Sequence, residues 1–386
     1  MVSKKVTYTI LSISLLTVMA GAAMAPALGV IQQHFADCSH LTVQFIVSLP
    51  ALFIIVTNLC FSRLCRYFGT KTLAIAGLLL YVLAGAGAFF VDNIAMILVL
   101  RALLGISVGM VMPLSTGLLA FYFPPEAQAG LMGLSAAMNQ LGGVVATLLA
   151  GLLASVGWNY AFLVYLLGLL ALAMVVAFLP NEHLRNECSA HISLKTLLRF
   201  HPSVVGMLLL MCVFFVFPTN FAIITSQTTE LSGTGITIIM VGLDVVAFGI
   251  GLVFGLLMEK MRRAVKYMAP LCFAAGYACY AFGVSVPWLI MGSVLIGVAN
   301  GVGVPYLNTI ASIKGGKDSA TTVMPLLSAA LYMGQFVSPL IVSLIARCFP
   351  SGDVLAPYKV AVLLSAVFLV QVFATRRHQS QPPTKD

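Results

Sequence analysis

Two ionisable residues, Asp244 and Arg101, lie well inside long apolar segments of this sequence. At the centre of a membrane each charged side chain would cost roughly 2.5–3.5 kcal/mol, so each requires a partner or an aqueous cavity. Desolvation and nearby charge determine when an aspartate at such a position takes up a proton, so Asp244 can carry one. An arginine can bind an anion or hydrogen-bond backbone carbonyls. For both residues the alternative to a functional role is a structural anchor between helices.

Uncharged polar side chains in the same segments predict the wall of a cavity. Ser135 and Asn139 are four residues apart and share a helix face, as do Ser328, Tyr332 and Gln335. Each alone is more typical of a helix–helix hydrogen bond, but together they favour a mostly apolar cavity suited to an organic solute more than to a bare ion. The predicted cavity residues are Asn139, Gln140, Asn220, Asn300, Tyr306, Tyr332 and Gln335.

Glycines and prolines repeat when the chain is shifted by 192 residues, about half its length of 386. The pattern Gly-x-x-x-Gly-x-x-x-Pro occurs in both halves, which predicts closely packed helices with matching bends. Arg101 and Asp244 have no charged counterpart at this shift, so the scaffold repeats and the charges do not. Tandem hydrophobic halves are typical of transporters. The predicted packing residues are Gly105, Gly109, Pro113, Gly142, Gly297, Gly301, Pro305, Gly334 and Pro339.

The composition places these segments in a membrane. The chain is 61% hydrophobic and 8% charged, with a mean hydropathy of +1.06, whereas a soluble domain has about 25% charged residues. Continuous apolar runs of about 20 residues indicate helices, not the alternating strands of a barrel. We predict an all-α polytopic protein with twelve spans, at about 7–32, 41–61, 72–91, 93–121, 129–154, 159–179, 203–226, 236–258, 267–285, 287–309, 321–346 and 357–375.

Lysine and arginine fall mainly in alternate loops, which predicts that both termini are cytoplasmic. The net charge of +9 fits anionic lipid headgroups better than nucleic acid, because the basic residues are dispersed. The longest internal polar stretch separates six spans from six. We predict an N-terminal bundle at 1–180, a cytoplasmic linker at 181–202, a C-terminal bundle at 203–376 and a disordered tail at 377–386.

Cysteine and histidine spacing predicts no metal site and no cofactor. Cys38 and Cys348 both fall in loops predicted to face outward, and their spacing leaves a disulfide open, because it does not show proximity. The absence of a short core followed by a small-residue cleavage site indicates that the first apolar stretch is a span and not a signal peptide.

Several local motifs resemble those of the major facilitator superfamily. Residues 62–71 read SRLCRYFGTK, where the family has Gly-x-x-x-Asp-Arg-x-Gly-Arg-Lys; Gly69 and Lys71 persist, and Arg66 stands at the aspartate position. Residues 101–105 read RALLG, similar to a motif whose arginine is associated with proton coupling. Residues 142–151 read GGVVATLLAG, similar to an antiporter motif whose missing proline occurs in the second half at Pro339. The resemblance implies two pseudosymmetric six-helix bundles, proton coupling through Arg101, and loss of the usual charged latch at Arg66. Asp244 is the second residue predicted to take part in proton coupling, because it lies inside an apolar span.

We therefore predict a secondary transporter, and not an enzyme, that works by alternating access. The favoured mode is proton-coupled efflux of a small amphipathic organic compound by a monomer in a bacterial inner membrane. The alternative is uptake or facilitated diffusion of a small organic anion, with Arg101 binding the anion. A membrane receptor that does not transport is a third interpretation, favoured only by the eroded latch motif.

Overall fold

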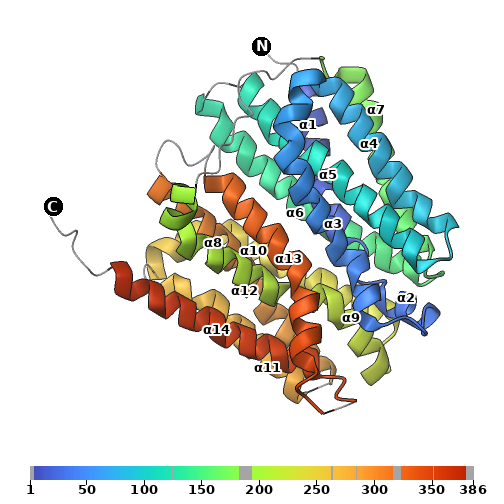
Figure 1. Ribbon diagram of the computed structural model, residues 1–386, viewed down its shortest axis with the longest axis vertical. Helices are drawn as coiled ribbons and strands as arrows, with labels where there is room; N and C mark the ends of the chain where they lie inside the picture. The colour runs from blue at the N-terminus through green and yellow to red at the C-terminus, as the bar shows by residue number, and fades with distance from the viewer. Residues whose placement is uncertain are drawn as a thin grey trace. The chain divides into compact units, whose positions relative to one another are not determined.

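The computed structural model describes residues 4–123, 125–181, 194–261, 264–283, 285–315, 323–350 and 352–379. Within these ranges the regular structure is helical, which confirms the predicted all-α class (Figure 1). The helices in chain order are α1 (Lys4–Ala22), α2 (Leu28–His34), α3 (His40–Tyr67), α4 (Thr70–Gly87), η1 (Ala88–Phe90), α5 (Ile94–Tyr122), α6 (Pro125–Ala154), η2 (Tyr160–Leu167), α7 (Gly168–Phe178), α8 (Leu194–Phe214), α9 (Val216–Thr228), α10 (Gly233–Met261), α11 (Val265–Phe282), α12 (Val286–Gly315), α13 (Met324–Ala346) and α14 (Ala356–Gln379).

Eleven helical segments of the described chain are long and apolar enough to cross a membrane. They correspond to all the predicted spans except the ninth. That segment is α11, a helix of 18 residues that contains Lys266 and three tyrosines and is therefore less apolar than the others. Segments of this length and hydropathy make the chain a multi-pass integral membrane protein.

Two predicted spans are broken helices. The first was expected to run without interruption, but α1 ends at Ala22 and a turn containing Pro26 precedes α2. The seventh is broken at Phe215, just before Pro218 in the first turn of α9. Proline has no backbone N–H to donate and is tolerated only near a helix start, so each chain segment begins a new helix there. The two prolines are 192 residues apart, so the breaks belong to the repeat.

The contacts within the chain divide it into two compact units. Unit 1 comprises Met1–Ser189 and Pro218–Asp244, and unit 2 comprises Ala190–Phe217 and Val245–Asp386. In unit 1, α1 packs on α6, α4 packs on α5 and α4 packs on α7. In unit 2, α8 packs on α13, α11 packs on α12 and α11 packs on α14. These pairs correspond across the repeat.

The predicted linker and tail are only partly described. Helix α8 begins at Leu194, inside the stretch predicted as a linker, whereas residues 182–193 lie outside the described part of the chain. Helix α14 continues to Gln379, three residues into the predicted tail. Residues 380–386 of that tail lie outside the description.

The repeated glycines lie where one helix meets the backbone of another. A β-carbon at Gly142 in α6 would overlap the Leu15 carbonyl oxygen in α1. At the matching position in unit 2, a β-carbon at Gly334 in α13 would lie 2.6 Å from the Leu208 carbonyl oxygen in α8. Such distances leave no room for any side chain, so these helix pairs pack backbone to backbone.

Other predicted packing residues follow the same principle. A β-carbon at Gly105 would overlap the carbonyl oxygen of Pro50 in α3, and one at Gly301 would lie 2.6 Å from that of Ala247 in α10. A β-carbon at Gly109 would lie 2.6 Å from Cβ of Thr57. Of the remaining members of this group, Gly297 is buried, and Pro113, Pro305 and Pro339 lie inside α5, α12 and α13.

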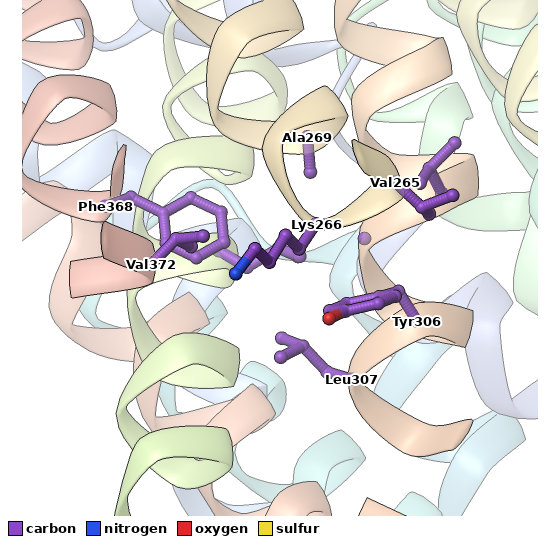
Figure 2. A pocket seen from close by; sticks show the side chains of 10 residues that line it. Val265, Lys266, Ala269, Tyr306, Leu307, Phe368 and Val372 are labelled. Carbon is purple, nitrogen blue, oxygen red and sulfur yellow. The ribbon is translucent and has the colours of Figure 1, made fainter. Parts of the chain in front are cut away.

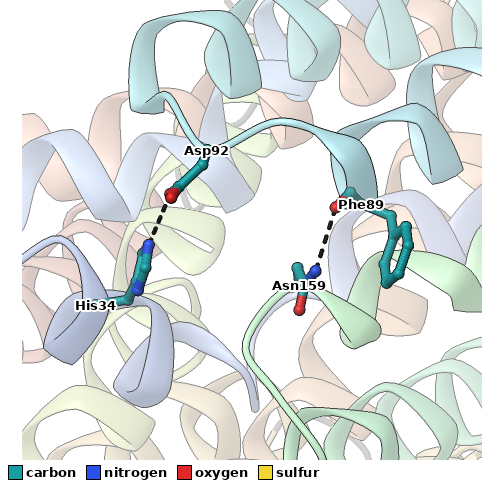
Figure 3. Close-up of polar contacts among 4 residues, drawn as sticks. All are labelled: His34, Phe89, Asp92 and Asn159. Atoms are coloured by element: carbon teal, nitrogen blue, oxygen red, sulfur yellow. Dashed lines mark hydrogen bonds and ion pairs between the residues drawn. The ribbon is translucent and has the colours of Figure 1, made fainter.

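At the end of unit 1 predicted to face outward, aromatic and polar side chains join three loops. His34, the last residue of α2, lies 2.7 Å from an Asp92 carboxylate oxygen, and the Asn159 amide donates to the Phe89 carbonyl (Figure 3). The Trp158 ring stacks on His34 with centroids 4.4 Å apart. The Asp92 side chain is 71% exposed, so water screens its charge.

This arrangement predicts that the stacked Trp158 ring contributes more to the free energy of unfolding than the ion pair between His34 and Asp92. Trp158→Ala is expected to lower the free energy of unfolding by about 3 kcal/mol, because a large aromatic contact is lost. Asp92→Asn is expected to cost at most about 1 kcal/mol, because exposed pairs contribute little. Thermal unfolding followed by circular dichroism measures both variants. A larger effect of Asp92→Asn would contradict the prediction.

Candidate coupling and substrate site

Asp244 and Thr147 form a polar contact between α10 and α6 in unit 1. The Thr147 hydroxyl donates to a carboxylate oxygen of Asp244 over 3.1 Å. One helical turn after Thr147, a β-carbon at Gly151 would overlap the side chain of Thr237, two turns before Asp244. Gly151 therefore allows the close approach of α6 that brings the Thr147 hydroxyl within reach of Asp244.

Asp244 has no basic partner among the described residues. The ion pairs His34–Asp92 and Lys359–Asp353 each join a helix end to a loop residue, and neither involves Asp244. The Asp244 side chain is half-buried, whereas Thr147 is only 3% exposed. Asp244 is therefore a carboxyl group inside an apolar span with a single neutral hydrogen-bond donor.

Arg101 lies in a separate, closed cluster of unit 1. Its side chain is fully buried, and one terminal nitrogen donates to the Tyr165 hydroxyl over 2.9 Å. The other terminal nitrogen donates to the Gly85 carbonyl over 3.3 Å. The guanidinium carbon lies 4.8 Å from the centroid of the Tyr165 ring and 5.1 Å from that of Phe162. Cation–π contacts and neutral acceptors therefore stabilise this charge in the absence of a described acid.

The cluster also ties Arg101 to other helices. The Tyr165 hydroxyl donates to the Ala20 carbonyl of α1 over 3.0 Å. In unit 2 the Tyr277 hydroxyl donates to the Val213 carbonyl, 193 residues after Ala20, over 2.7 Å. Each unit thus has a tyrosine hydroxyl bonded to a backbone carbonyl of its first long helix, although Tyr165 lies on η2 and Tyr277 on α11. The geometry favours the anchor interpretation of Arg101, and its role in proton coupling stays a prediction.

Two predicted cavity residues make hydrogen bonds between helices. Asn139 accepts a hydrogen bond from the Thr17 hydroxyl over 2.7 Å, which ties α6 to α1. Asn220 accepts one from the Gln44 amide over 2.7 Å, which ties α9 to α3. Among the described residues, Gln335 has a long contact, 4.0 Å from the Met211 sulfur.

The other predicted cavity residues are not brought together in the described contacts. The Asn300 amide oxygen is buried without a hydrogen-bond partner among the described residues. Gln140 is exposed and Tyr332 is half-buried. Tyr306 is the one member of the group that lines the pocket of Figure 2, which lies wholly in unit 2.

Sequence reasoning missed the hydrogen-bonding partners of the predicted residues. Thr147 lies in the stretch 142–151, at the position where the antiporter motif has a proline. This departure from the motif was the one feature of the sequence that could have drawn attention to Thr147. Gln44 and Thr17 are polar residues in apolar spans and could have been selected on the same grounds as Asn139. No pattern in the sequence marked Tyr165 or Gly85 as partners of Arg101.

Lys71 and Gly69, the two residues that persist from the loop motif, contact other residues of unit 1. The Lys71 ammonium donates to the Val176 carbonyl at the end of α7 over 2.8 Å. A β-carbon at Gly69 would overlap the Asn181 side chain. The side chain of Arg66 lies outside the described part of the chain. Lys71 therefore caps a helix C-terminus, where a cation is favourable.

Residues 10–339 match the model of the Major Facilitator Superfamily. The chain belongs to this family. The quinolone resistance protein NorA of Staphylococcus aureus is 24% identical over 342 residues, which are 82% of this chain and 83% of that protein. The niacin transporter NiaP of Acinetobacter baylyi is 28% identical over 116 residues, 30% of this chain and 26% of that protein.

Solved structures of transporters have the same fold. A bacterial homologue of the human lysosomal transporter Spinster aligns with a TM-score of 0.81 at 15% identity, covering 99% of this chain and 100% of that chain. The nucleoside transporter NupG aligns with a TM-score of 0.78 at 10% identity, covering 96% and 99%. Membership of the superfamily confirms that the chain is a membrane transporter of a small molecule and not an enzyme.

Proposed function

We propose that the chain exports a small amphipathic organic compound in exchange for protons, with Asp244 as the proton carrier. The observation that supports this is the half-buried Asp244 carboxyl, which accepts a hydrogen bond from the neutral Thr147 hydroxyl. An ionised carboxylate is costly in apolar surroundings, whereas a protonated one is not. Protonation of Asp244 therefore changes the energy of states that expose or enclose it.

The two six-helix bundles, 1–180 and 203–376, move relative to one another to give alternating access. A proton binds Asp244 from the outward side and leaves on the cytoplasmic side when substrate binds. A proton crossing 100 mV supplies about 2.3 kcal/mol, enough for accumulation of tens-fold. The protein acts as a monomer in a bacterial inner membrane with both termini cytoplasmic, the orientation that the basic loops support.

An organic substrate follows from the scattered hydrogen-bonding groups in otherwise apolar spans. NorA, whose name states quinolone resistance, supports export of an organic compound at 24% identity. The alternative, anion uptake through Arg101, has less support, because that guanidinium is fully buried and engaged by Tyr165 and Gly85.

Transport into proteoliposomes with an imposed proton gradient tests the proposal. With cationic and neutral dyes as probes, we expect accumulation only when protons can flow in the opposite direction, and its loss when a protonophore collapses the gradient. Counterflow of unlabelled against labelled dye, which needs no gradient, is the control for intact protein. Accumulation that is unaffected by the protonophore would overturn proton coupling.

A further inference from the structure

The break between α8 and α9 lies beside the hydroxyl of one buried tyrosine. In an uninterrupted helix the Phe214 carbonyl would accept from the backbone N–H four residues on, but that residue is Pro218, which has no N–H. The Tyr277 hydroxyl of α11 lies 3.2 Å from the Phe214 carbonyl oxygen and 2.7 Å from that of Val213. A buried carbonyl without a hydrogen bond is costly. Tyr277 therefore takes the place of the hydrogen bond that the proline removes.

Aromatic packing fixes the position of this hydroxyl. Tyr277 is fully buried, and its ring stacks with those of Phe273 and Tyr358, with centroids 6.4 and 6.3 Å apart. A tyrosine hydroxyl has a single proton to donate. Because the hydroxyl is held beside two successive carbonyl oxygens, its hydrogen bond can pass from one to the other as the break bends.

The chain passes from one compact unit to the other at this break. Unit 2 includes the chain up to Phe217, unit 1 takes Pro218–Asp244, and unit 2 resumes with the next residue. We call Pro218–Asp244 the arm; it contains most of α9 and the first part of α10. The break at Phe215 thus lies next to one end of the arm, and the Asp244 carboxyl lies at the other end.

The repeat does not account for Tyr277. At the shift of 192 residues its counterpart on α4 is Gly85, which has no side chain. In unit 1 the tyrosine that bonds the last turn of α1 is Tyr165 of η2, whose hydroxyl donates to the Ala20 carbonyl. The chain stays in unit 1 across that break. Tyr277 is therefore specific to the break at which the chain changes unit.

We propose that Tyr277 is a positioning residue for transport, whose hydroxyl holds the hinge at Phe215 about which the arm moves. The inference rests on the proposed alternating access but not on proton coupling, because the hydroxyl bonds the backbone whatever Asp244 binds. Without the hydroxyl the break frays, and the arm no longer turns about a fixed point. Loss of the hydroxyl therefore slows the movement of the arm and leaves the binding of substrate unchanged.

Counterflow of the labelled dyes in proteoliposomes, which needs no proton gradient, tests the effect on transport in the full chain. Tyr277→Phe keeps the ring and is expected to lower the maximal rate about tenfold, the effect of one lost hydrogen bond to a buried carbonyl, with KM changed less than about twofold. An unchanged maximal rate, or a change in KM alone, would overturn the proposal.

Hydrogen–deuterium exchange of the purified protein in detergent tests the hinge without transport. In Tyr277→Phe the backbone amides of residues 211–220 are expected to exchange about tenfold faster than in the wild type. If the wild type itself showed no counterflow, the proposed function would fail, and unchanged exchange at 211–220 would separately overturn the hinge.

Tyr280→Phe is the matched control. Tyr280 is equally buried, lies one helical turn from Tyr277 on α11, and its hydroxyl lies 2.6 Å from the Ser293 hydroxyl. We expect Tyr280→Phe to keep the wild-type maximal rate and the wild-type exchange at 211–220. Equal effects of the two substitutions would overturn the proposal in favour of general packing among the aromatic rings.

A second background tests the link to the proline. Pro218→Ala restores a backbone N–H that can pair with the Phe214 carbonyl. Adding Tyr277→Phe to Pro218→Ala is therefore expected to speed exchange at 211–220 less than about twofold, against about tenfold when the proline is present. If Tyr277→Phe had the same effect with and without the proline, its hydroxyl would not replace the missing hydrogen bond, and the proposal would be overturned.

Discussion

Gly142→Ala is expected to destabilise the protein by about 3 kcal/mol, the upper part of the usual range for overpacking. The added β-carbon would overlap the Leu15 carbonyl oxygen. A backbone carbonyl cannot rotate away as a side chain can, so α1 must move as a whole. Thermal unfolding in detergent, followed by the helical circular dichroism signal at one fixed scan rate, measures the effect, because membrane proteins often unfold irreversibly.

The adjacent residue provides the matched control. A β-carbon at Gly143 would meet only Cγ1 of Val18, at 3.2 Å, and that methyl belongs to a side chain that can adjust. Alanine is favoured over glycine inside a helix by about 1 kcal/mol. Gly143→Ala is therefore expected to leave the melting temperature unchanged or to raise it. If both variants melted alike, the backbone contact at Gly142 would not limit the packing of α1 and α6.

The repeat extends this prediction to unit 2. Gly334→Ala is expected to destabilise in the same direction as Gly142→Ala, because its β-carbon would lie 2.6 Å from the Leu208 carbonyl oxygen and 2.8 Å from Cβ of Met211. Gly249 in α10 has nothing within 4 Å of a β-carbon. Gly249→Ala therefore serves as the control for a glycine inside a membrane helix without a close neighbour.

Hydropathy predicted the helices well because lipid imposes one constraint on every span. Backbone groups must be paired internally, so length and apolarity locate a membrane helix. The same reasoning missed the break at Pro26, because the residues around it are as apolar as the helices that it separates. It placed α11 among the spans on its overall apolar character, although Lys266 and the tyrosines reduce its hydropathy.

The candidate site was predictable only in part. Asp244 and Arg101 stood out because a charge inside an apolar segment is costly whatever its neighbours are. Their partners could not be predicted, because Thr147 and Tyr165 lie 97 and 64 residues away in the sequence. A polar side chain such as Asn139 looks the same in the sequence whether it faces a cavity or, as here, bonds Thr17. Only the packing of the helices distinguishes these cases.

Asp244→Asn is expected to abolish proton-driven accumulation of the substrate, a loss of at least about tenfold, since accumulation of tens-fold depends on the proton's share of the driving force. Asparagine keeps the size of the side chain, and its amide oxygen can still accept the Thr147 hydroxyl hydrogen bond. The variant can no longer gain or lose a proton. Counterflow, in which substrate exchanges for substrate without a gradient, is therefore expected to persist in proteoliposomes.

Two control variants separate the proton from the hydrogen bond and from charge in general. Thr147→Val removes the hydroxyl but keeps nearly the same side-chain shape, and the Asp244 carboxyl is unchanged. Accumulation is therefore expected to continue at a reduced rate. Asp353→Asn removes an acid in the loop between α13 and α14. There the Lys359 ammonium, 2.7 Å away, holds the pKa of Asp353 below its ordinary range. Asp353 therefore stays ionised across the pH range of the assay, and this variant should accumulate substrate like the wild type.

The ratio of accumulation to counterflow distinguishes a loss of proton coupling from misfolding, because a misfolded variant loses both activities. If Asp244→Asn retains counterflow and loses accumulation, the proton coupling depends on the Asp244 carboxyl group. If Asp244→Asn accumulated substrate as the wild type does, the carboxyl would be an anchor between α10 and α6, and the proton would have to bind elsewhere. Arg101 is a poor replacement as carrier, because an arginine stays protonated in proteins. Such a result would therefore favour transport without protons over coupling through Arg101.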